Sequence, residues 1–237
     1  MIPKTVQKSR LSNYDIIRNM EKSTKSALLY TLPFAVWMGL MFTLPATAEA
    51  YAVRSAATLV AGIACWAAHR KGGASHSAQI KPGDACISAV SGLAVGLAVF
   101  ALWIWIPSWP YDEPSVSEAL PYAPETCGWP LTIAKLAGSA FIIAPAEELF
   151  FRSFLYRRLI ARDFTSVSPS HFDLSAFAWV VFLFTLEHNR PVAAAITGAA
   201  YGLLSIRFGI HSAIVAHVTT NLALAIHVIF NNAWQFW

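Results

Sequence analysis

The stretch LTIAKLAGSAFIIAPAEELFFRSF, residues 131–154, is strongly apolar until it reaches two adjacent carboxylates, Glu147 and Glu148. An apolar run of this length is typical of a helix that crosses a bilayer, because about 20 helical residues span the hydrocarbon core. Ionisable side chains are costly there, and by default they indicate a functional site. The stretch therefore predicts a membrane helix with a functional site inside it.

The whole chain has the composition of a membrane protein. Of its 237 residues, 56% are hydrophobic and 13% are charged, whereas about a quarter of residues are charged in soluble domains. The apolar windows predict an all-α polytopic membrane helix bundle of about seven, or eight, transmembrane helices. We find seven windows, at residues 26–46, 52–69, 86–106, 131–154, 174–188, 192–206 and 213–230.

The distribution of charge predicts the orientation of the bundle. Basic residues occupy the N-terminal tail, the second loop and the fourth loop, whereas the third loop, residues 107–130, holds four acidic residues and no basic one. The positive-inside rule then places the N-terminus in the cytoplasm and the third loop outside. The net charge of +4 fits cytoplasmic loops beside anionic lipid and requires no nucleic-acid partner.

Four parts of the chain follow from these patterns. Residues 1–25 form a basic cytoplasmic tail, and residues 26–130 hold the first three transmembrane helices with the acidic external loop. Residues 131–230 form the helix core that carries the intramembrane polar groups, and residues 231–237 form an aromatic tail whose Trp234 and Trp237 suit the membrane interface. The sequence ATA at residues 46–48 resembles a signal-peptide cleavage site, but the preceding apolar stretch favours an uncleaved helix.

Polar residues from three of the windows are expected at similar depth in the membrane: Glu147, Glu148, His188, His217 and Asn221. A bundle without a function has no reason to bear the desolvation cost of two carboxylates and two imidazoles at one level. We therefore interpret this set as a functional site. The other intramembrane histidines and the three cysteines are interpreted as packing residues.

Helical spacing predicts which of these side chains share a face. Three pairs lie four residues apart: Glu148 with Arg152, Phe184 with His188, and His217 with Asn221. Glu147 is rotated by about 100° from Glu148 around a helix. One carboxylate is therefore expected to face a cavity, while the other pairs with Arg152.

Carboxylates and imidazoles around a wet cavity can activate water, and a second imidazole with an amide can stabilise an oxyanion. No GxSxG motif marks a serine nucleophile, so direct attack by water is the simplest chemistry. A metal site is the alternative, with Glu147, His188 and His217 as three zinc ligands. Because no HExxH motif is present, we expect that no cofactor is required.

Three motifs in this order resemble those of a known family. EELFFR at residues 147–152 fits EExxxR, FTLEH at 184–188 fits FxxxH, and HVTTN at 217–221 fits HxxxN. Together they resemble the CPBP family of intramembrane proteases, which includes CAAX prenyl endopeptidases and the bacteriocin-processing and self-immunity proteins called Abi. The extended motifs and the final WQFW further resemble an exosortase- and PEP-CTERM-associated bacterial subgroup.

The resemblance implies an activity and assigns roles within residues 131–230. Glu147 and His188 would activate water, His217 and Asn221 would stabilise the oxyanion, and Glu148, Arg152 and Phe184 would support them. The expected function is a CAAX-protease-like intramembrane endopeptidase in the bacterial inner membrane, acting on a membrane-associated protein or peptide within the lipid bilayer. A proton-coupled transporter and a non-catalytic immunity or binding protein remain as alternatives.

Overall fold

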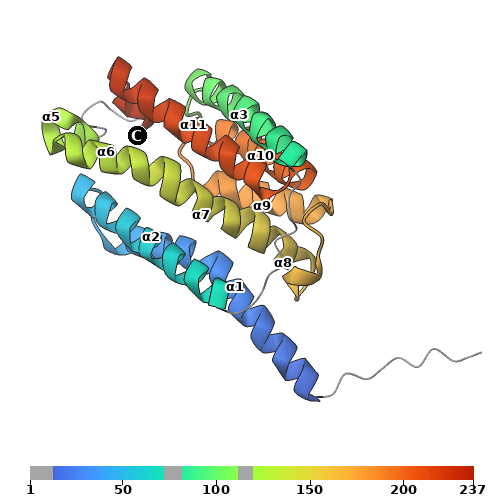
Figure 1. The fold of residues 1–237 in the computed structure, drawn as a ribbon. Helices are drawn as coiled ribbons and strands as arrows, with labels where there is room; N and C mark the ends of the chain where they lie inside the picture. The colour runs from blue at the N-terminus through green and yellow to red at the C-terminus, as the bar shows by residue number, and fades with distance from the viewer. Residues whose placement is uncertain (1–12, 72–81, 112–119) are drawn as a thin grey trace, which may run out of the picture.

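The computed structural model describes residues 13–71, 82–111 and 120–237. Within these ranges the chain forms helices and no strands, which confirms the all-α bundle (Figure 1). Residues 1–12 of the basic N-terminal tail and the acidic residues Asp112, Glu113 and Glu118 lie outside the described residues.

Six helical stretches of the described chain are long and apolar enough to cross a membrane. They comprise α1 (Asn13–Thr43), α2 (Ala48–Lys71), α3 (Pro82–Trp105), the stretch Trp129–Ile160, α10 (Pro191–Phe208) and α11 (Ile210–Asn231). The seventh apolar window forms α9 (Leu174–Leu186), which at 13 residues is too short to cross a bilayer alone. Every predicted window is thus a helix, and α1 begins well before the expected residue 26.

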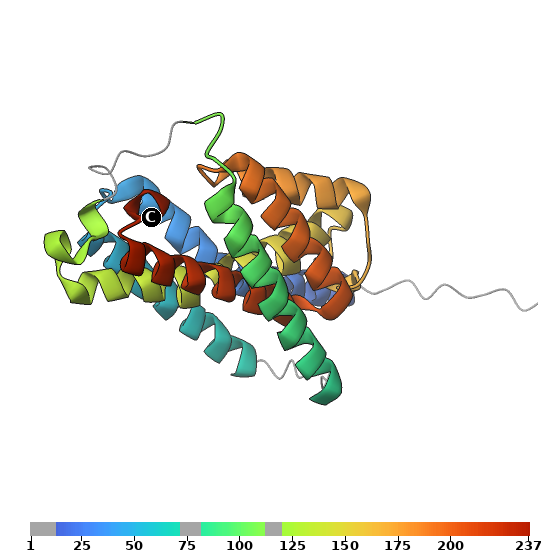
Figure 2. The same cartoon turned by 90° about the horizontal axis from the view of Figure 1, so that it is seen from above.

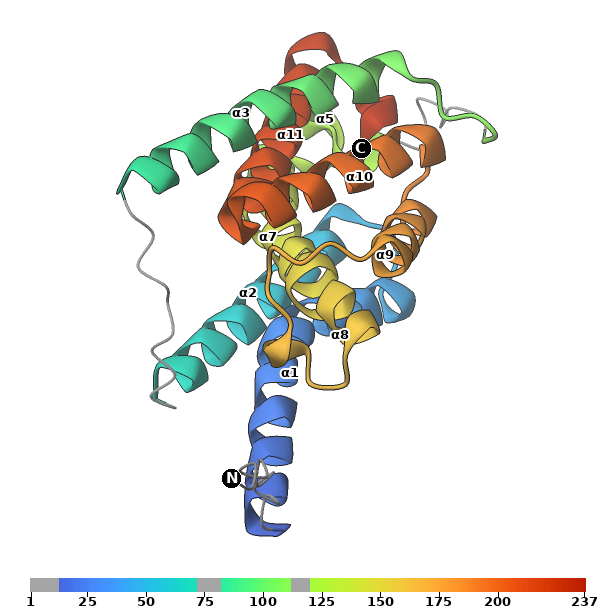
Figure 3. The same ribbon diagram turned by 90° about the vertical axis from the view of Figure 1, so that its right-hand side faces the viewer.

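The stretch Trp129–Ile160 is a single continuous rod between two groups of helices. It consists of α6 (Trp129–Ala137), η2 (Gly138–Ile143), α7 (Ala144–Glu148), η3 (Leu149–Leu155) and α8 (Tyr156–Ile160). Helices α1 and α2 pack on one side of this rod, and α3, α10 and α11 form a layer on the other (Figures 1 and 3). Seen from above, α3 crosses α11 at the surface of that layer (Figure 2). The rod is therefore the element around which the site is built.

Short segments close the ends of the bundle. These are η1 (Leu120–Tyr122), α5 (Pro124–Cys127), η4 (Phe164–Ser166) and η5 (Trp234–Phe236). After α11 the backbone turns at Asn232, which adopts the left-handed conformation with φ 52°, and η5 follows. Trp234 is consequently buried against Ala123 and Val228 rather than exposed at the interface.

The central rod is π-helical on both sides of α7. Pro145 has no amide proton, so the carbonyl four residues earlier would lose its partner in a regular α-helix. A π-helical turn, such as η2 just before it, pairs a carbonyl with the amide five residues later and avoids the missing donor. Glu147 and Glu148 therefore lie on one short α-helical segment between two wider ones.

Glycine pairs let the helices approach closely, as their small-xxx-small spacing predicts. A Cβ on Gly96 would meet the Ala216 carbonyl oxygen at 2.5 Å, and one on Gly92 would meet the Ser212 carbonyl oxygen at 2.6 Å. These glycines set the contact between α3 and α11. A second pair, on α10, leaves room for the phenyl rings of α9. The result is that the helix bearing His217 is held directly against α3.

Candidate active site

The fully buried carboxylate of Glu148 joins two helices. Its Oε2 lies 3.2 Å from Nε of Arg152, one turn further along the rod, as the spacing of the motif predicts. Its Oε1 accepts a hydrogen bond of 2.9 Å from Nδ1 of His217 on α11. Burying a carboxylate is costly unless nearby positive charge and hydrogen bonds compensate its own charge. Glu148 thus holds both Arg152 and His217 in place, whereas the sequence alone predicted only the first contact.

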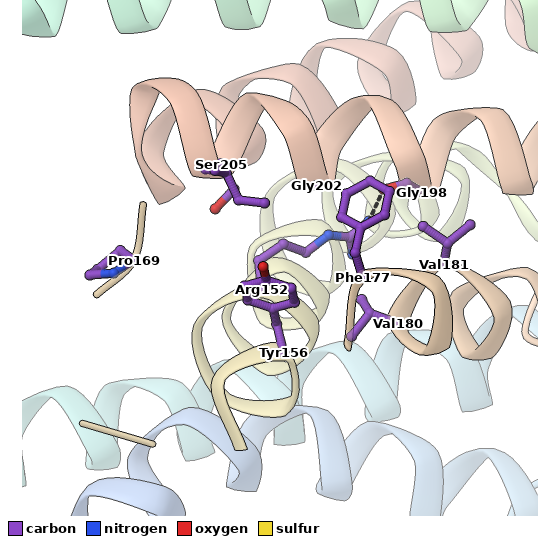
Figure 4. A pocket seen from close by; sticks show the side chains of 10 residues that line it. Arg152, Tyr156, Pro169, Phe177, Val180, Val181, Gly198, Gly202 and Ser205 are labelled. Carbon is purple, nitrogen blue, oxygen red and sulfur yellow. Dashed lines mark hydrogen bonds between the residues drawn. The ribbon is translucent and has the colours of Figure 1, made fainter. Parts of the chain in front are cut away.

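Arg152 is held by further contacts on the far side of Glu148. Its guanidinium donates a hydrogen bond of 3.4 Å to the carbonyl of Gly198 (Figure 4). Its Cζ lies 4.5 Å from the ring centroid of Phe184. Beside Arg152 is a hollow of about 10 Å³, lined by Tyr156, Phe177 and others, which is roughly the space of a single water. Phe184 therefore contacts both the guanidinium of Arg152 and the ring of His188, which is consistent with a supporting role.

Glu147 points away from this buried pair and into a larger cavity. Its Oε2 lies 3.8 Å from Nε2 of His217, and its side chain is 13% exposed. Oε2 is buried without a hydrogen-bond partner among the described residues. A buried carboxylate oxygen without a donor is costly, so its natural partner is a bound water or substrate. The two adjacent glutamates therefore differ in surroundings as their 100° separation predicts.

His188 lies just after the end of α9, with its ring against Phe184. Its Nδ1 is 2.7 Å from the carbonyl oxygen of Phe184. Because a carbonyl can only accept, Nδ1 carries the proton. In the neutral ring Nε2 is then an acceptor, as a general base requires. The interruption of the helix by Pro191, which begins α10, leaves this short connection free to turn His188 toward the cavity.

Asn221 lies one turn after His217 and is less free than the sequence suggests. Its Nδ2 donates a hydrogen bond of 2.9 Å to the carbonyl of Ser139, in the π-helical segment η2. An amide nitrogen has two protons, so one donor remains for a ligand. The contact with Ser139 also fixes the direction in which that second proton points.

These side chains meet around one cavity of about 230 Å³, large enough for several waters. All four residues predicted to be catalytic line it: Glu147, His188, His217 and Asn221. The remaining lining residues include Trp103, Lys135, Ser139, Thr197, Tyr201, Thr220 and Leu224. Phe236 and Trp237 from the C-terminal tail also line it, so Trp237 contributes to the cavity instead of a simple aromatic belt.

Tyr201 and Thr220 form a hydrogen-bonded pair beside His217 that the sequence motifs did not predict. The ring of Tyr201 on α10 packs on the imidazole with centroids 5.2 Å apart, and its hydroxyl donates a bond of 2.6 Å to Oγ1 of Thr220. Thr220 in turn donates to the carbonyl of Gly96 at 2.8 Å. Both side chains are buried. No motif contains Tyr201, which is only notable in the sequence for preceding Gly202. Thr220 lies within HVTTN, at one of the variable positions of the HxxxN motif.

The alternative with a zinc ion requires at least three ligand side chains close together. Among the residues that the structure describes, no group of three or more His, Cys, Asp or Glu side chains is arranged to hold a metal ion. The neighbouring carboxylate and imidazole, Glu147 and His217, are 3.8 Å apart. Ligands about 2.0–2.2 Å from a tetrahedral zinc ion lie about 3.5 Å from each other, so the separation of Glu147 and His217 is itself compatible with a shared metal ion.

The fold and the site define a polytopic, all-α membrane protein with paired carboxylate and imidazole groups around a buried cavity. Residues 129–223 match the family model described as type II CAAX prenyl endopeptidase Rce1-like. This segment, which contains the three motifs, is therefore similar to the Rce1-like family within the CPBP group. Searches of curated proteins and of solved structures gave no match.

Proposed function

We propose that the protein is an intramembrane endopeptidase that cleaves a membrane-associated peptide or protein tail with water activated by Glu147 and His188. The observation that carries this proposal is Oε2 of Glu147, which accepts no hydrogen bond from the described residues and lies in one cavity with both imidazoles. A water in this cavity would donate a proton to the carboxylate while its oxygen attacks the scissile carbonyl. The Nε2 of His188 is oriented as a second acceptor by the contact between Nδ1 and Phe184.

His217 and Asn221 are suited to hold the oxyanion formed by that attack. His217 donates Nδ1–H to Glu148, so only a protonated ring has a second proton, on Nε2, to offer the substrate. The Glu148 carboxylate stabilises that charge by direct contact. The second amide proton of Asn221 supplies a second donor. Tyr201 and the backbone of Ser139 fix the orientations of these two groups.

The family and the helix bundle support a substrate that reaches the cavity from the bilayer. A prenylated peptide with a CaaX end is one such substrate, and the matching family is one of CAAX prenyl endopeptidases. A sorting-signal tail processed beside an exosortase is another. The inner membrane of a bacterium, with the N-terminus in the cytoplasm, is the location that the basic loops favour.

The decisive experiment is cleavage by the purified protein in lipid vesicles. A fluorogenic, membrane-anchored peptide should be cleaved by the wild type and not by Glu147→Gln, because an amide keeps the shape of the side chain but cannot accept the proton of water. Glu49→Gln is the matched control, since Glu49 is exposed at the start of α2. Near-normal turnover by Glu147→Gln would remove Glu147 from water activation.

A chelator tests the alternative chemistry in the same assay. We expect cleavage to continue after exhaustive treatment with a zinc chelator and dialysis, because water activation by Glu147 and His188 uses no metal. Loss of cleavage that returns on addition of zinc, and not of magnesium, would instead assign Glu147, His188 and His217 as ligands.

A further inference from the structure

Two cations lie inside the bundle away from the motifs. Arg54, on α2, is 6% exposed, and Lys135, on α6, is half-buried. Each lies six residues after the start of its helix, Ala48 and Trp129 respectively, or about 9 Å along the axis. No salt bridge joins either cation to a carboxylate in the described part of the chain. Intramembrane charges without a partner are expensive, so this pair requires an explanation.

Aromatic rings surround the two cations. The Nζ of Lys135 lies 4.0 Å from the ring centroid of Tyr51 and 4.6 Å from that of Tyr122. The Cζ of Arg54 lies 5.5 Å from the ring centroids of both Trp37 and Tyr51. Cation–π contacts of this kind contribute about 0.5–2 kcal/mol each. They orient the cations but do not neutralise them.

The aromatic cage leaves hydrogen-bonding capacity unused. Nε of Arg54 is buried and has no hydrogen-bond partner among the residues that the structure describes. Arg54 and Lys135 both lie within 5.5 Å of the ring centroid of Tyr51, so their like charges are close enough to repel each other. A purely structural role would favour a neutral side chain at one of these positions, because two like charges destabilise each other in a region of low polarity. An anion placed between the two cations and the cavity would offset their mutual repulsion and could accept a hydrogen bond from Arg54.

Lys135 connects this pair to the reaction site because it lines the same cavity as Glu147. The two residues are 147 − 135 = 12 positions apart on the central rod, a separation of about 18 Å in an α-helix and somewhat less through the π-helical segment. An extended peptide advances about 3.3–3.6 Å per residue, so roughly four to five residues fill this distance.

We propose that Lys135, supported by Arg54, binds a carboxylate of the peptide substrate roughly four to five residues from the scissile bond. The proposal rests on the proposed peptidase function. The carboxylate belongs either to the C-terminus of the substrate or to an acidic side chain at that distance. Lys135 supplies a charge-assisted hydrogen bond, and Arg54 strengthens it from α2, outside the segment that matches the family model.

Peptide binding tests this proposal without any cleavage. The Glu147→Gln protein in nanodiscs of neutral lipid is titrated with three fluorescent peptides that share one apolar sequence. The first ends in a free carboxylate, the second in an amide, and the third in an amide after a glutamate. We expect at least one acidic peptide to bind about 10- to 100-fold more tightly than the neutral amide, the range for a hydrogen bond between charged groups. If the peptide with a free C-terminus binds more tightly, the carboxylate is the C-terminus of the substrate. If the peptide with the glutamate binds more tightly, it is an acidic side chain.

Lys135→Met and Lys135→Arg, made in the Glu147→Gln protein, identify the residue responsible. The methionine variant should bind the acidic peptides no better than the amide, with affinity for the amide unchanged, while the arginine variant should keep most of the preference. Equal binding of all three peptides by the parent, or an equal loss for all three in Lys135→Met, would overturn the proposal. A third outcome would also overturn it. If anionic lipid raised the melting temperature of the parent but not of Lys135→Met, and no peptide reversed this effect, the anion bound by Lys135 would be a lipid.

The two proposals can fail separately. A Lys135-dependent preference for acidic peptides would stand even if the wild-type protein cleaved none of them. Cleavage of the acidic and neutral peptides with equal kcat/KM would support the peptidase and overturn the carboxylate subsite. The melting temperature of each variant confirms that it is folded before its affinity is compared.

Discussion

Nδ1 of His217 donates a hydrogen bond of 2.9 Å to Oε1 of Glu148, across 69 residues of sequence. The same carboxylate carries the salt bridge to Arg152. The second glutamate of the EExxxR motif is therefore the link between the central rod and α11, while the first glutamate is left to face the cavity. One buried carboxylate thus orients an imidazole and leaves its neighbour available for chemistry.

We expect Glu148→Gln to lower both stability and activity. Removing one member of a buried ion pair costs about 3–5 kcal/mol, because the remaining charge of Arg152 has no counterion. The amide also cannot stabilise a protonated His217. Thermal unfolding in detergent and the catalytic rate of the surviving folded protein are the measurements. An unchanged melting temperature would contradict the role of Glu148 as the link between the two helices.

Asn221→Ala should reduce kcat much more than it raises KM, since an oxyanion exists fully only near the transition state. Loss of one oxyanion donor costs on the order of 10² to 10³ in rate. Asn231→Ala is a matched control, because Asn231 is exposed at the end of the same helix. Asn221→Asp should be at least as severe, since a carboxylate repels the developing negative charge.

Single-turnover cleavage separates this role from substrate positioning. If Asn221→Ala weakened binding while the single-turnover rate stayed normal, the amide would position the substrate or brace Ser139 rather than hold the oxyanion. The hydrogen bond to Ser139 also predicts a modest loss of stability, of about 1 kcal/mol.

Gly96→Ala should destabilise the protein because the added methyl group would meet the backbone of α11. That contact involves a carbonyl oxygen, which cannot move aside like the end of a flexible side chain. It also separates Gly96 from Thr220, which donates to the carbonyl of Gly96. Gly62→Ala on α2 is the control, since nothing lies within 4 Å of a Cβ there. Equal melting temperatures for the two variants would show that α3 and α11 can separate without cost.

A cysteine introduced at Ser117, in a background without the exposed Cys86, should react with a membrane-impermeant reagent added from outside intact cells. Ser117 lies in the acidic third loop, which the positive-inside rule places opposite the basic loops. A cysteine at Arg162, in the basic fourth loop, should react only after the membrane is broken. The reverse pattern would invert the orientation of the whole bundle.

Much of the fold could be predicted from the sequence because a bilayer demands long apolar helices and glycine pairs that allow close packing. All seven apolar windows are helices, and the pairing of Glu148 with Arg152 follows from helical spacing alone. The π-helical turns around Pro145 could not be derived from the same regular spacing. They alter the phase of the central rod, and with it the exact direction of each side chain.

The sequence by itself determined which residues could take part: the three motifs place carboxylates, imidazoles and an amide on separate helices because local spacing sets the face of each. Only the tertiary structure decided which of these residues contact each other. Glu148 bonds to His217, Asn221 bonds to Ser139, and Lys135 joins Glu147 along one cavity. These contacts depend on how the central rod and α11 pack, and side-chain packing over such sequence distances leaves no periodic trace in the chain.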